Sequence, residues 1–302
     1  MNTSPAVTGV YCAVATPLRE NGDPDLSLFS VHCKRLLDEG CHGLALLGTT
    51  GEANSFSEGE RRLIVESALA AGIAPDRLMP GTGVAAIPDT VALTKHALSL
   101  GVSRVVMLPP FYYKGVSDEG LYAAYSQIIE KIKDNRLKII LYHIPQVSGI
   151  PLSIPLIKRL AAAFPDTVVG IKDSAGDFNN MQAIIAELPN FSVLAGADPL
   201  LLPLLQAGGA GCITATSNLI ADSLRFIFDH VSDAEKSAEI EAAQARINAF
   251  RTLSSSYVQI PTVKAMIGLK TGEGAWIRTR APLIALTEAE QADLATKFAA
   301  LA

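Results

Sequence analysis

The stretch Val168-Val169-Gly170-Ile171-Lys172-Asp173-Ser174 is a short apolar run that ends in a lysine. Such a run, rich in β-branched residues, is typical of a buried strand. Lys172 then lies where the strand opens into its loop, and loss of solvation there favours the neutral amine that attacks a ketone. A lysine after an apolar run is usually only a solvated strand end, so the rest of the chain must decide between the two interpretations.

Similar apolar runs recur along the chain and alternate with amphipathic segments. We predict eight strands at 10–16, 42–48, 77–81, 104–109, 138–144, 167–172, 192–196 and 211–216, with helical patterns such as 26–39, 58–71, 89–100, 119–133 and 154–164 between them. Strict strand-helix alternation implies right-handed parallel crossovers, and eight units in roughly 200–250 residues is the size of a (β/α)8 TIM barrel. A doubly wound open sheet is the competing architecture, but the even spacing without a linker favours one barrel.

The pattern changes after the eighth unit. Segments 233–253, 260–269 and 287–301 look helical, with Pro261 near the start of one and Thr287 as the N-cap of another. We therefore expect an α/β barrel over residues 1–230 and a C-terminal three-helix extension over 231–302. The extension could cover the barrel or form a subunit contact.

Composition favours a small-molecule partner. The 302 residues are 49% hydrophobic and carry a net charge of −5, which gives no basic field for nucleic acid or for an anionic membrane. Four cysteines without CxxC spacing fit a reducing compartment, and residues 1–9 lack the pattern of a secretory signal. We expect a cytoplasmic protein that binds neither nucleic acid nor membrane.

Three predicted strand ends carry polar groups that should meet at the mouth of a barrel. The second strand ends in Gly48-Thr49-Thr50-Gly51-Glu52, where two glycines allow a tight turn and the hydroxyl and N–H groups suit a carboxylate. The fifth ends in Tyr142-His143-Ile144-Pro145 and the sixth in Lys172, so a phenol for acid–base work should lie beside the amine. Each feature alone has an ordinary explanation, a capped loop or a packed tyrosine, and their convergence favours function.

At this point the chain resembles the dihydrodipicolinate synthase/N-acetylneuraminate lyase family of Schiff-base aldolases. The motifs that carry the resemblance are Thr16-Pro17, Gly48-Thr49-Thr50-Gly51-Glu52, Pro110-Phe111-Tyr112-Tyr113, Tyr142-His143-Ile144-Pro145, Gly170-Ile171-Lys172-Asp173 and Pro261-Thr262-Val263-Lys264. The resemblance implies a barrel with three extra helices, usually a homotetramer, and no metal or organic cofactor.

The resemblance also implies roles for single residues. Lys172 would form an imine with pyruvate or another 2-oxo acid, and Tyr142 would be the acid–base. Thr49 and Thr50 would hold the substrate carboxylate and relay protons. Tyr113 would complete the relay across a subunit contact. Gly196, Asp198 and Ile213 are the further residues expected to contact substrate.

Two departures from the family pattern bear on the substrate. Val147 stands where dihydrodipicolinate synthases have the arginine that receives the second substrate's carboxylate, and an aliphatic chain cannot pair with a carboxylate. Of the Asp-Glu pair and serine that sialic acid lyases use for sugar hydroxyls, this chain keeps only Asp198, with Ala215 at the serine position. We therefore expect a lyase of a 2-keto-3-deoxy sugar acid or a related hydroxy-oxo acid. The alternatives are 4-hydroxy-tetrahydrodipicolinate synthase and a dehydratase of the same family.

Rival interpretations come from other classes of protein. The run 81–86 fits G-x-G-x-x-A, as in dinucleotide-binding oxidoreductases, but an acidic residue about 20 positions on is missing. A sensor that kept the barrel and lost catalysis is a third hypothesis, opposed by the intact Lys172 and Tyr142. The pairs at 32–33 and 41–42 lack zinc-ligand spacing, so we expect core thiols and partly exposed histidines. His143 should point away from the barrel axis if Tyr142 faces it.

Overall fold

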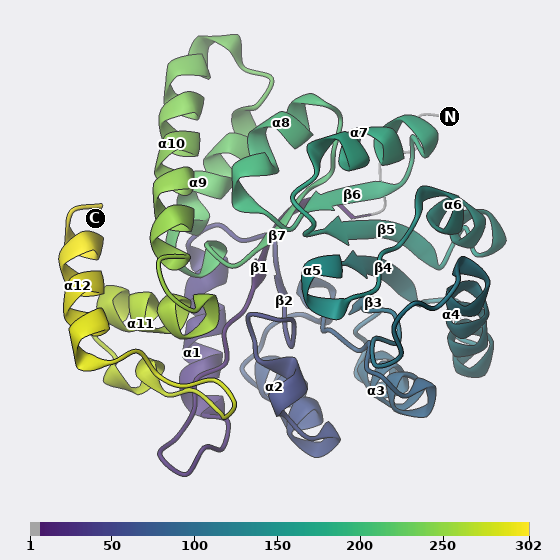
Figure 1. Cartoon of the computed structure of the whole chain (residues 1–302), viewed down its shortest axis with the longest axis horizontal. Coiled ribbons are helices and arrows are strands. Elements are labelled where there is room, and N and C mark those ends of the chain that lie inside the picture. The colour runs from purple at the N-terminus through teal and green to yellow at the C-terminus, as the bar shows by residue number, and fades with distance from the viewer. Residues whose placement is uncertain (1–6, 302) are drawn as a thin grey trace.

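The computed structural model describes residues 7–301, in which parallel strands form a central sheet enclosed by helices (Figure 1). The strands follow the order β2-β1-β7-β6-β5-β4-β3, and each hydrogen-bonded pair is parallel. Their bounds are β1 Gly9–Ala13, β2 Gly43–Ala45, β3 Arg104–Met107, β4 Lys138–His143, β5 Val168–Asp173, β6 Ser192–Ala195 and β7 Gly211–Thr214.

The eighth position of the barrel is occupied by an irregular segment, residues 78–82, between β2 and β3. Single parallel bridges join Leu78 to Leu44 and Gly81 to Val106. The Val106 N–H donates to the carbonyl of Pro80 over 3.0 Å. Proline has no N–H and cannot extend a regular ladder. The predicted (β/α)8 barrel is confirmed, whereas the prediction of a regular strand at 77–81 was wrong.

Helices surround the barrel and begin where the sequence places good caps. Ser57 and Thr287 each form a capping box with the glutamate three residues later, so both helix starts satisfy backbone N–H groups that would otherwise lack a partner. The predicted N-cap at Thr287 is confirmed. The helix bounds are α1 Leu26–Asp38, α2 Glu58–Ala70, α3 Ile87–Ser99, α4 Asp118–Ile132, α5 Pro145–Ser148, α6 Ile154–Ala163, α7 Phe178–Glu187, α8 Leu201–Gln206, α9 Ser217–His230, α10 Ser237–Ser254, α11 Gln259–Thr271 and α12 Glu288–Ala299.

Successive side chains along the strands belong alternately to two apolar clusters. On β4, Ile140 and Tyr142 belong to a smaller cluster inside the barrel, whereas Ile139 and Leu141 belong to the larger cluster between the strands and the helices. This alternation follows from the two-residue period of a strand. It sends Tyr142 toward the barrel axis, as predicted.

The cysteines are free and buried, as predicted, and Cys33 belongs to the outer cluster. The prediction of partly exposed histidines was wrong for His32. This side chain is buried, its Nε2 lies 2.9 Å from the Oδ1 of Asn218, and burial lowers its pKa to about 3.

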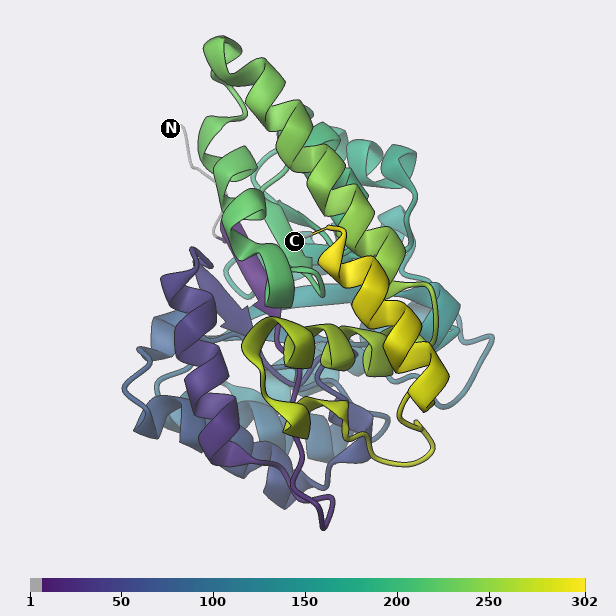
Figure 2. The ribbon, with the colours of Figure 1, turned by 90° about the vertical axis from the view of Figure 1, so that its left-hand side faces the viewer.

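The three C-terminal helices form one side of the molecule, with α10 lying along α9 and α12 crossing near α10 and α11 (Figure 2). The structure confirms three helices in the predicted segments. Among residues 7–301, none of the helices has the length and apolar character needed to cross a membrane.

Candidate active site

A cavity of about 270 Å³ lies at the carboxyl ends of the strands. Its volume is close to the lower end of the about 300–1,000 Å³ that small-molecule pockets occupy. The barrel supplies most of its wall, and the C-terminal helices add Arg251, Gln259 and Ile260. Six of the predicted site residues line it: Thr49, Thr50, Tyr142, Lys172, Gly196 and Ile213.

Lys172 and Tyr142 lie directly opposite each other on adjacent strands, β5 and β4. Their side chains are 5% and 4% exposed, and the Nζ of Lys172 lies 4.3 Å from the centre of the Tyr142 ring. The structure therefore brings together the predicted amine and phenol in a site that is largely closed to water.

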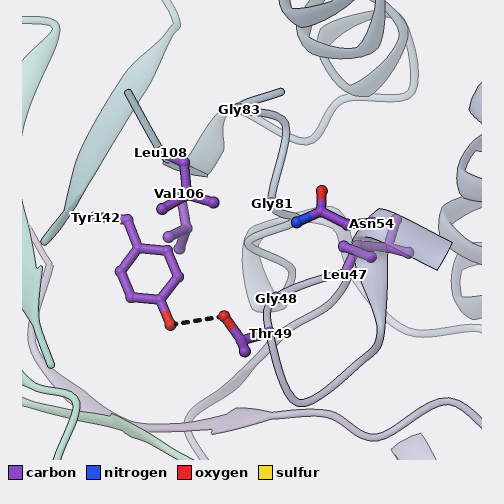
Figure 3. Close-up of a pocket in the computed structure, with 10 residues that line it drawn as sticks. Leu47, Gly48, Thr49, Asn54, Gly81, Gly83, Val106, Leu108 and Tyr142 are labelled. Atoms are coloured by element: carbon purple, nitrogen blue, oxygen red, sulfur yellow. Dashed lines mark hydrogen bonds between the residues drawn. The ribbon is translucent and has the colours of Figure 1, made fainter. Parts of the chain in front are cut away.

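The phenol hydroxyl of Tyr142 forms a hydrogen bond with a second hydroxyl, that of Thr49. Its oxygen lies 3.1 Å from the Oγ1 of Thr49, and either group can donate the hydrogen bond (Figure 3). Behind this pair is a cavity of about 30 Å³ lined by Gly48, Val106 and Leu108 among others, large enough for one water molecule. The Tyr142–Thr49 pair is a path along which a proton can leave or reach the larger cavity.

The loop between β2 and the next helix is held in a strained conformation. Leu47 and Glu52, the residues that flank Gly48–Gly51, both have φ of 55°, a left-handed conformation that costs non-glycine residues free energy and is common at functional sites. The prediction that the glycines supply the tight turn was wrong, because neither Gly48 nor Gly51 has positive φ. Instead, a Cβ on Gly51 would lie 2.7 Å from the carbonyl oxygen of Val14, so this glycine permits close approach to the end of β1.

Two backbone N–H groups of the same loop belong to residues that line the cavity, Thr49 and Thr50. Within residues 7–301, neither the Thr49 nor the Thr50 N–H donates to a backbone or side-chain acceptor. Two adjacent N–H groups without a protein acceptor, together with two hydroxyls, are the donors that the predicted carboxylate receptor requires.

A buried ion pair fixes the end of this loop, and sequence reasoning assigned it no role. The Nζ of Lys264, on α11, donates to the Oε1 of Glu52, and the Arg280 N–H donates to Oε2 over 3.3 Å. Burial lowers the pKa of Lys264, and the Glu52 carboxylate opposes that shift. The signal in the sequence was a lysine inside the apolar run 260–267, a position that requires a partner.

Gly196 follows β6 and lines the cavity beside Ser174. A Cβ at this position would lie 1.9 Å from the Ser174 Oγ, so only glycine fits between this side chain and the cavity. The lining also includes apolar side chains. Val147 is 62% exposed and lines the cavity where related synthases would place a cation, and Ala215 lines it without a hydroxyl.

Asp198 does not line the cavity, in contrast to its predicted contact with substrate. It is completely buried in the turn after β6, where the hydroxyl of Thr216 donates to its Oδ1. Its Oδ2 has no hydrogen-bond partner among the described residues and lies 4.0 Å from the Nε of Arg251. Arg251, which the sequence analysis missed, reaches the cavity wall from α10.

Tyr113 lies outside the cavity of its own chain. Its side chain is 76% exposed and packs edge to face on Tyr112, with ring centres 5.3 Å apart. The nearby Lys114 donates to the carbonyl oxygens of Phe111 and Ser148 and does not line the cavity. Lys114 therefore does not take the place of the missing arginine at Val147.

The residues behind the rival interpretations have structural roles. A Cβ on Gly81 would lie 2.2 Å from the Leu47 carbonyl oxygen, and one on Gly83 would lie 2.4 Å from the Leu108 nitrogen, so both glycines permit close packing of the backbone. His143 faces away from the cavity, as predicted, and its Nδ1 accepts from the Leu152 N–H over 3.1 Å. Across residues 7–301, no group of three or more histidine, cysteine, aspartate and glutamate side chains is placed to hold a metal ion.

Comparison with known proteins agrees with this geometry. Residues 6–301 match the model of the dihydrodipicolinate synthetase family. A protein of Chloroflexus aurantiacus described as an uncharacterized DapA-like lyase is 33% identical over 291 residues, which are 96% of this chain and 95% of that protein.

Two solved structures are similar over nearly the whole chain. The dihydrodipicolinate synthase of Agrobacterium tumefaciens has a TM-score of 0.90 at 33% identity, covering 97% of this chain and 99% of its own. The E. coli K12 prophage protein YagE, solved in complex with pyruvate, has a TM-score of 0.89 at 25% identity, covering 97% and 98%.

Proposed function

Because the chain belongs to the dihydrodipicolinate synthetase family, we propose that it is a carbon-carbon lyase that binds a 2-oxo acid as an imine on Lys172. The observation that carries the proposal is the placement of the buried Lys172 amine beside Tyr142, in a cavity whose other wall is the Thr49-Thr50 loop. The pyruvate complex of a relative supports a 2-oxo acid as substrate.

The residues divide the chemistry as follows. The Lys172 nitrogen attacks C2 of the 2-oxo acid, and the former ketone oxygen leaves as water after receiving a proton through Tyr142. Thr49 and Thr50 hold the carboxylate, which fixes C2 within reach of the amine. The resulting iminium accepts the electron pair when the C3–C4 bond breaks, the C4 hydroxyl gives up its proton, and that part of the substrate leaves as an aldehyde. The enamine left on Lys172 takes a proton at C3, and water then hydrolyses the imine to release the shorter 2-oxo acid and the free amine. The same steps in reverse form the C3–C4 bond. The imine supplies the electron sink, so we propose that no metal or organic cofactor takes part.

The rim of the cavity supports a hydroxy-oxo acid as the longer substrate. Val147 replaces the arginine that the synthases of this family use, which argues against aspartate semialdehyde as the natural partner of pyruvate. We propose cleavage or formation of a 2-keto-3-deoxy sugar acid or related hydroxy-oxo acid. The synthase reaction and dehydration remain the alternatives, because Lys172 and Tyr142 serve all three.

We also propose a homotetramer in which a neighbouring copy brings Tyr113 to the site. The exposed Tyr112–Tyr113 pair supports this, because monomers rarely leave two adjacent aromatic rings in solvent without a partner. A cytoplasmic location is proposed from the free, buried cysteines, which suit a reducing compartment.

Trapping tests the central proposal. The protein is incubated with pyruvate, reduced with borohydride, and digested for peptide mass spectrometry. The expected adduct is on Lys172 and is absent in Lys172→Ala. Lys264 serves as an internal control, because it is equally buried but lies outside the cavity. No adduct on Lys172, or an equal adduct on Lys264, would exclude the imine mechanism. Full activity after EDTA treatment is expected, and loss restored by a divalent ion would contradict the metal-free chemistry.

A further inference from the structure

The cavity carries more positive charge than the imine chemistry uses. Among the described residues that line it, Lys172 and Arg251 are the basic ones and none is a carboxylate. Lys172 forms the imine in the proposed function, and the 2-oxo carboxylate is held by the Thr49-Thr50 loop. Arg251 therefore faces the cavity without a part in that chemistry.

Arg251 is free to bind a ligand. Its side chain is 32% exposed, and within residues 7–301 its guanidinium donates no hydrogen bond. The nearest anion is Asp198, whose Oδ2 lies 4.0 Å from Nε, beyond hydrogen-bonding distance. Among the described residues, neither terminal nitrogen of the guanidinium has a hydrogen-bond partner, and Nε is the guanidinium atom that lies 4.0 Å from the Asp198 carboxylate.

The carboxylate of Asp198 is the group that positions the Arg251 guanidinium. It is completely buried, its Oδ1 accepts from the Thr216 hydroxyl, and its Oδ2 has no hydrogen-bond partner within residues 7–301. A buried carboxylate with an unpaired oxygen attracts the nearest cation strongly. Asp198 thus attracts the Arg251 guanidinium from a position outside the cavity lining, while Arg251 itself belongs to that lining.

We infer that Arg251 binds a second anionic group on the substrate, at the end remote from the 2-oxo carboxylate. The planar fork of two terminal nitrogens fits the paired oxygens of a carboxylate or a phosphate. The substrate class is then a 2-oxo acid whose far end carries a carboxylate or phosphate. This inference rests on the proposed function and names the substrate class of the same site. Asp198 is a positioning residue that acts through Arg251.

Matched aldehydes test the inference in the condensation direction. Pyruvate is supplied with succinic semialdehyde against butanal, and with glyceraldehyde 3-phosphate against glyceraldehyde, so that one pair probes a carboxylate and the other a phosphate. The unaltered protein is expected to prefer the charged member of at least one pair. In Arg251→Met that preference falls about 10- to 100-fold through KM, as loss of one charge-assisted contact requires. The kcat/KM for the neutral member stays within about threefold.

Two variants serve as controls. Arg246→Met removes a cation from the same helix that pairs with Asp222 at the surface, and it should leave both preferences unchanged. Arg251→Lys keeps the positive charge but not the two terminal guanidinium nitrogens, so it should lose part of the preference for the charged aldehyde. It also provides the test if Arg251→Met does not fold.

The outcomes separate the two proposals. Equal loss for charged and neutral aldehydes, or a preference unchanged in Arg251→Met, would overturn the role of Arg251. Borohydride trapping of pyruvate on Lys172 should be the same in Arg251→Met and in the unaltered protein. Absence of the adduct in the unaltered protein would overturn the proposed function itself.

Discussion

The Nζ of Lys264 lies 2.5 Å from the Oε1 of Glu52, and neither side chain has any solvent exposure. Glu52 ends the loop that carries Thr49 and Thr50, and Lys264 comes from α11 in the C-terminal extension. The C-terminal extension therefore holds the Thr49-Thr50 loop through a buried ion pair that water does not screen.

Lys264→Met should destabilise the protein by about 3–5 kcal/mol, because it leaves the Glu52 carboxylate buried without its partner. Urea unfolding measures the loss. The control is Lys158→Met, which breaks a pair with Glu187 whose side chains are 46% and 48% exposed and should cost at most about 1 kcal/mol. The double variant Glu52→Gln/Lys264→Met should recover part of the stability. Equal effects of the two single variants would contradict the structural role of the buried pair.

Tyr142→Phe should lower kcat by about 10²–10⁴-fold with little change in KM, because it removes the acid–base group but not the volume of the side chain. Steady-state kinetics on the preferred substrate checks this. Tyr125→Phe is the matched control, since Tyr125 is also buried and donates to the Met107 carbonyl outside the cavity. Near-normal turnover in Tyr142→Phe would assign the proton transfer to another group.

Mixed oligomers test the contribution of Tyr113. Lys172→Ala and Tyr113→Phe chains should each be almost inactive alone. After joint unfolding and refolding they should regain activity, because a Tyr113→Phe chain keeps its own Lys172 and receives the Tyr113 of its neighbour. Activity is compared with that of the separately refolded variants. No recovery despite assembly into mixed species would show that Tyr113 does not act across subunits.

Aspartate semialdehyde should be used about ten- to hundredfold less well than succinic semialdehyde, which differs from it only by the absent amino group. The cavity is lined by the basic side chains of Lys172 and Arg251 and, among the described residues, by no carboxylate that could receive an ammonium. Comparison of kcat/KM for the two aldehydes with pyruvate measures the effect. A higher value for aspartate semialdehyde would favour the synthase reaction.

Stability should depend on pH through Glu60, whose pKa is lowered to about 2, chiefly by hydrogen bonds from Arg280. Since the folded pKa lies below the unfolded value of 4.5, the contribution is fully present above pH 4.5 and is lost as the pH falls toward 2. The pair is 24% exposed on each side, so solvent screening limits it to about 1 kcal/mol. Glu60→Gln should be less stable than the unaltered protein at pH 7 in urea, and the difference should shrink at pH 3. A constant difference would contradict this assignment.

The barrel and the central pair of the site could be predicted because both depend on local patterns. Alternating apolar runs identify the strands, and Tyr142 and Lys172 each end one, so parallel pairing brings them together. The irregularity of the segment predicted as a strand at 77–81 could also have been predicted, because Pro80 has no N–H to donate to a strand ladder. Asp198 and Arg251 depend on how α10 packs over the turn after β6. Helical periodicity identifies the apolar face of α10 but does not show which other element packs against that face. The sequence therefore could not predict that Asp198 is buried away from the cavity or that Arg251 lines it.

Arg251, Gln259, Ile260 and Lys264 complete a site whose lysine lies much earlier in the chain. During synthesis on a ribosome, which adds about 5–20 residues per second, Lys172 emerges well before the helices that close the cavity and anchor the loop at Glu52. A nascent barrel would therefore hold its amine without the wall that selects a substrate. The order of the elements along the chain therefore delays the completed cavity wall until α11 has left the exit tunnel.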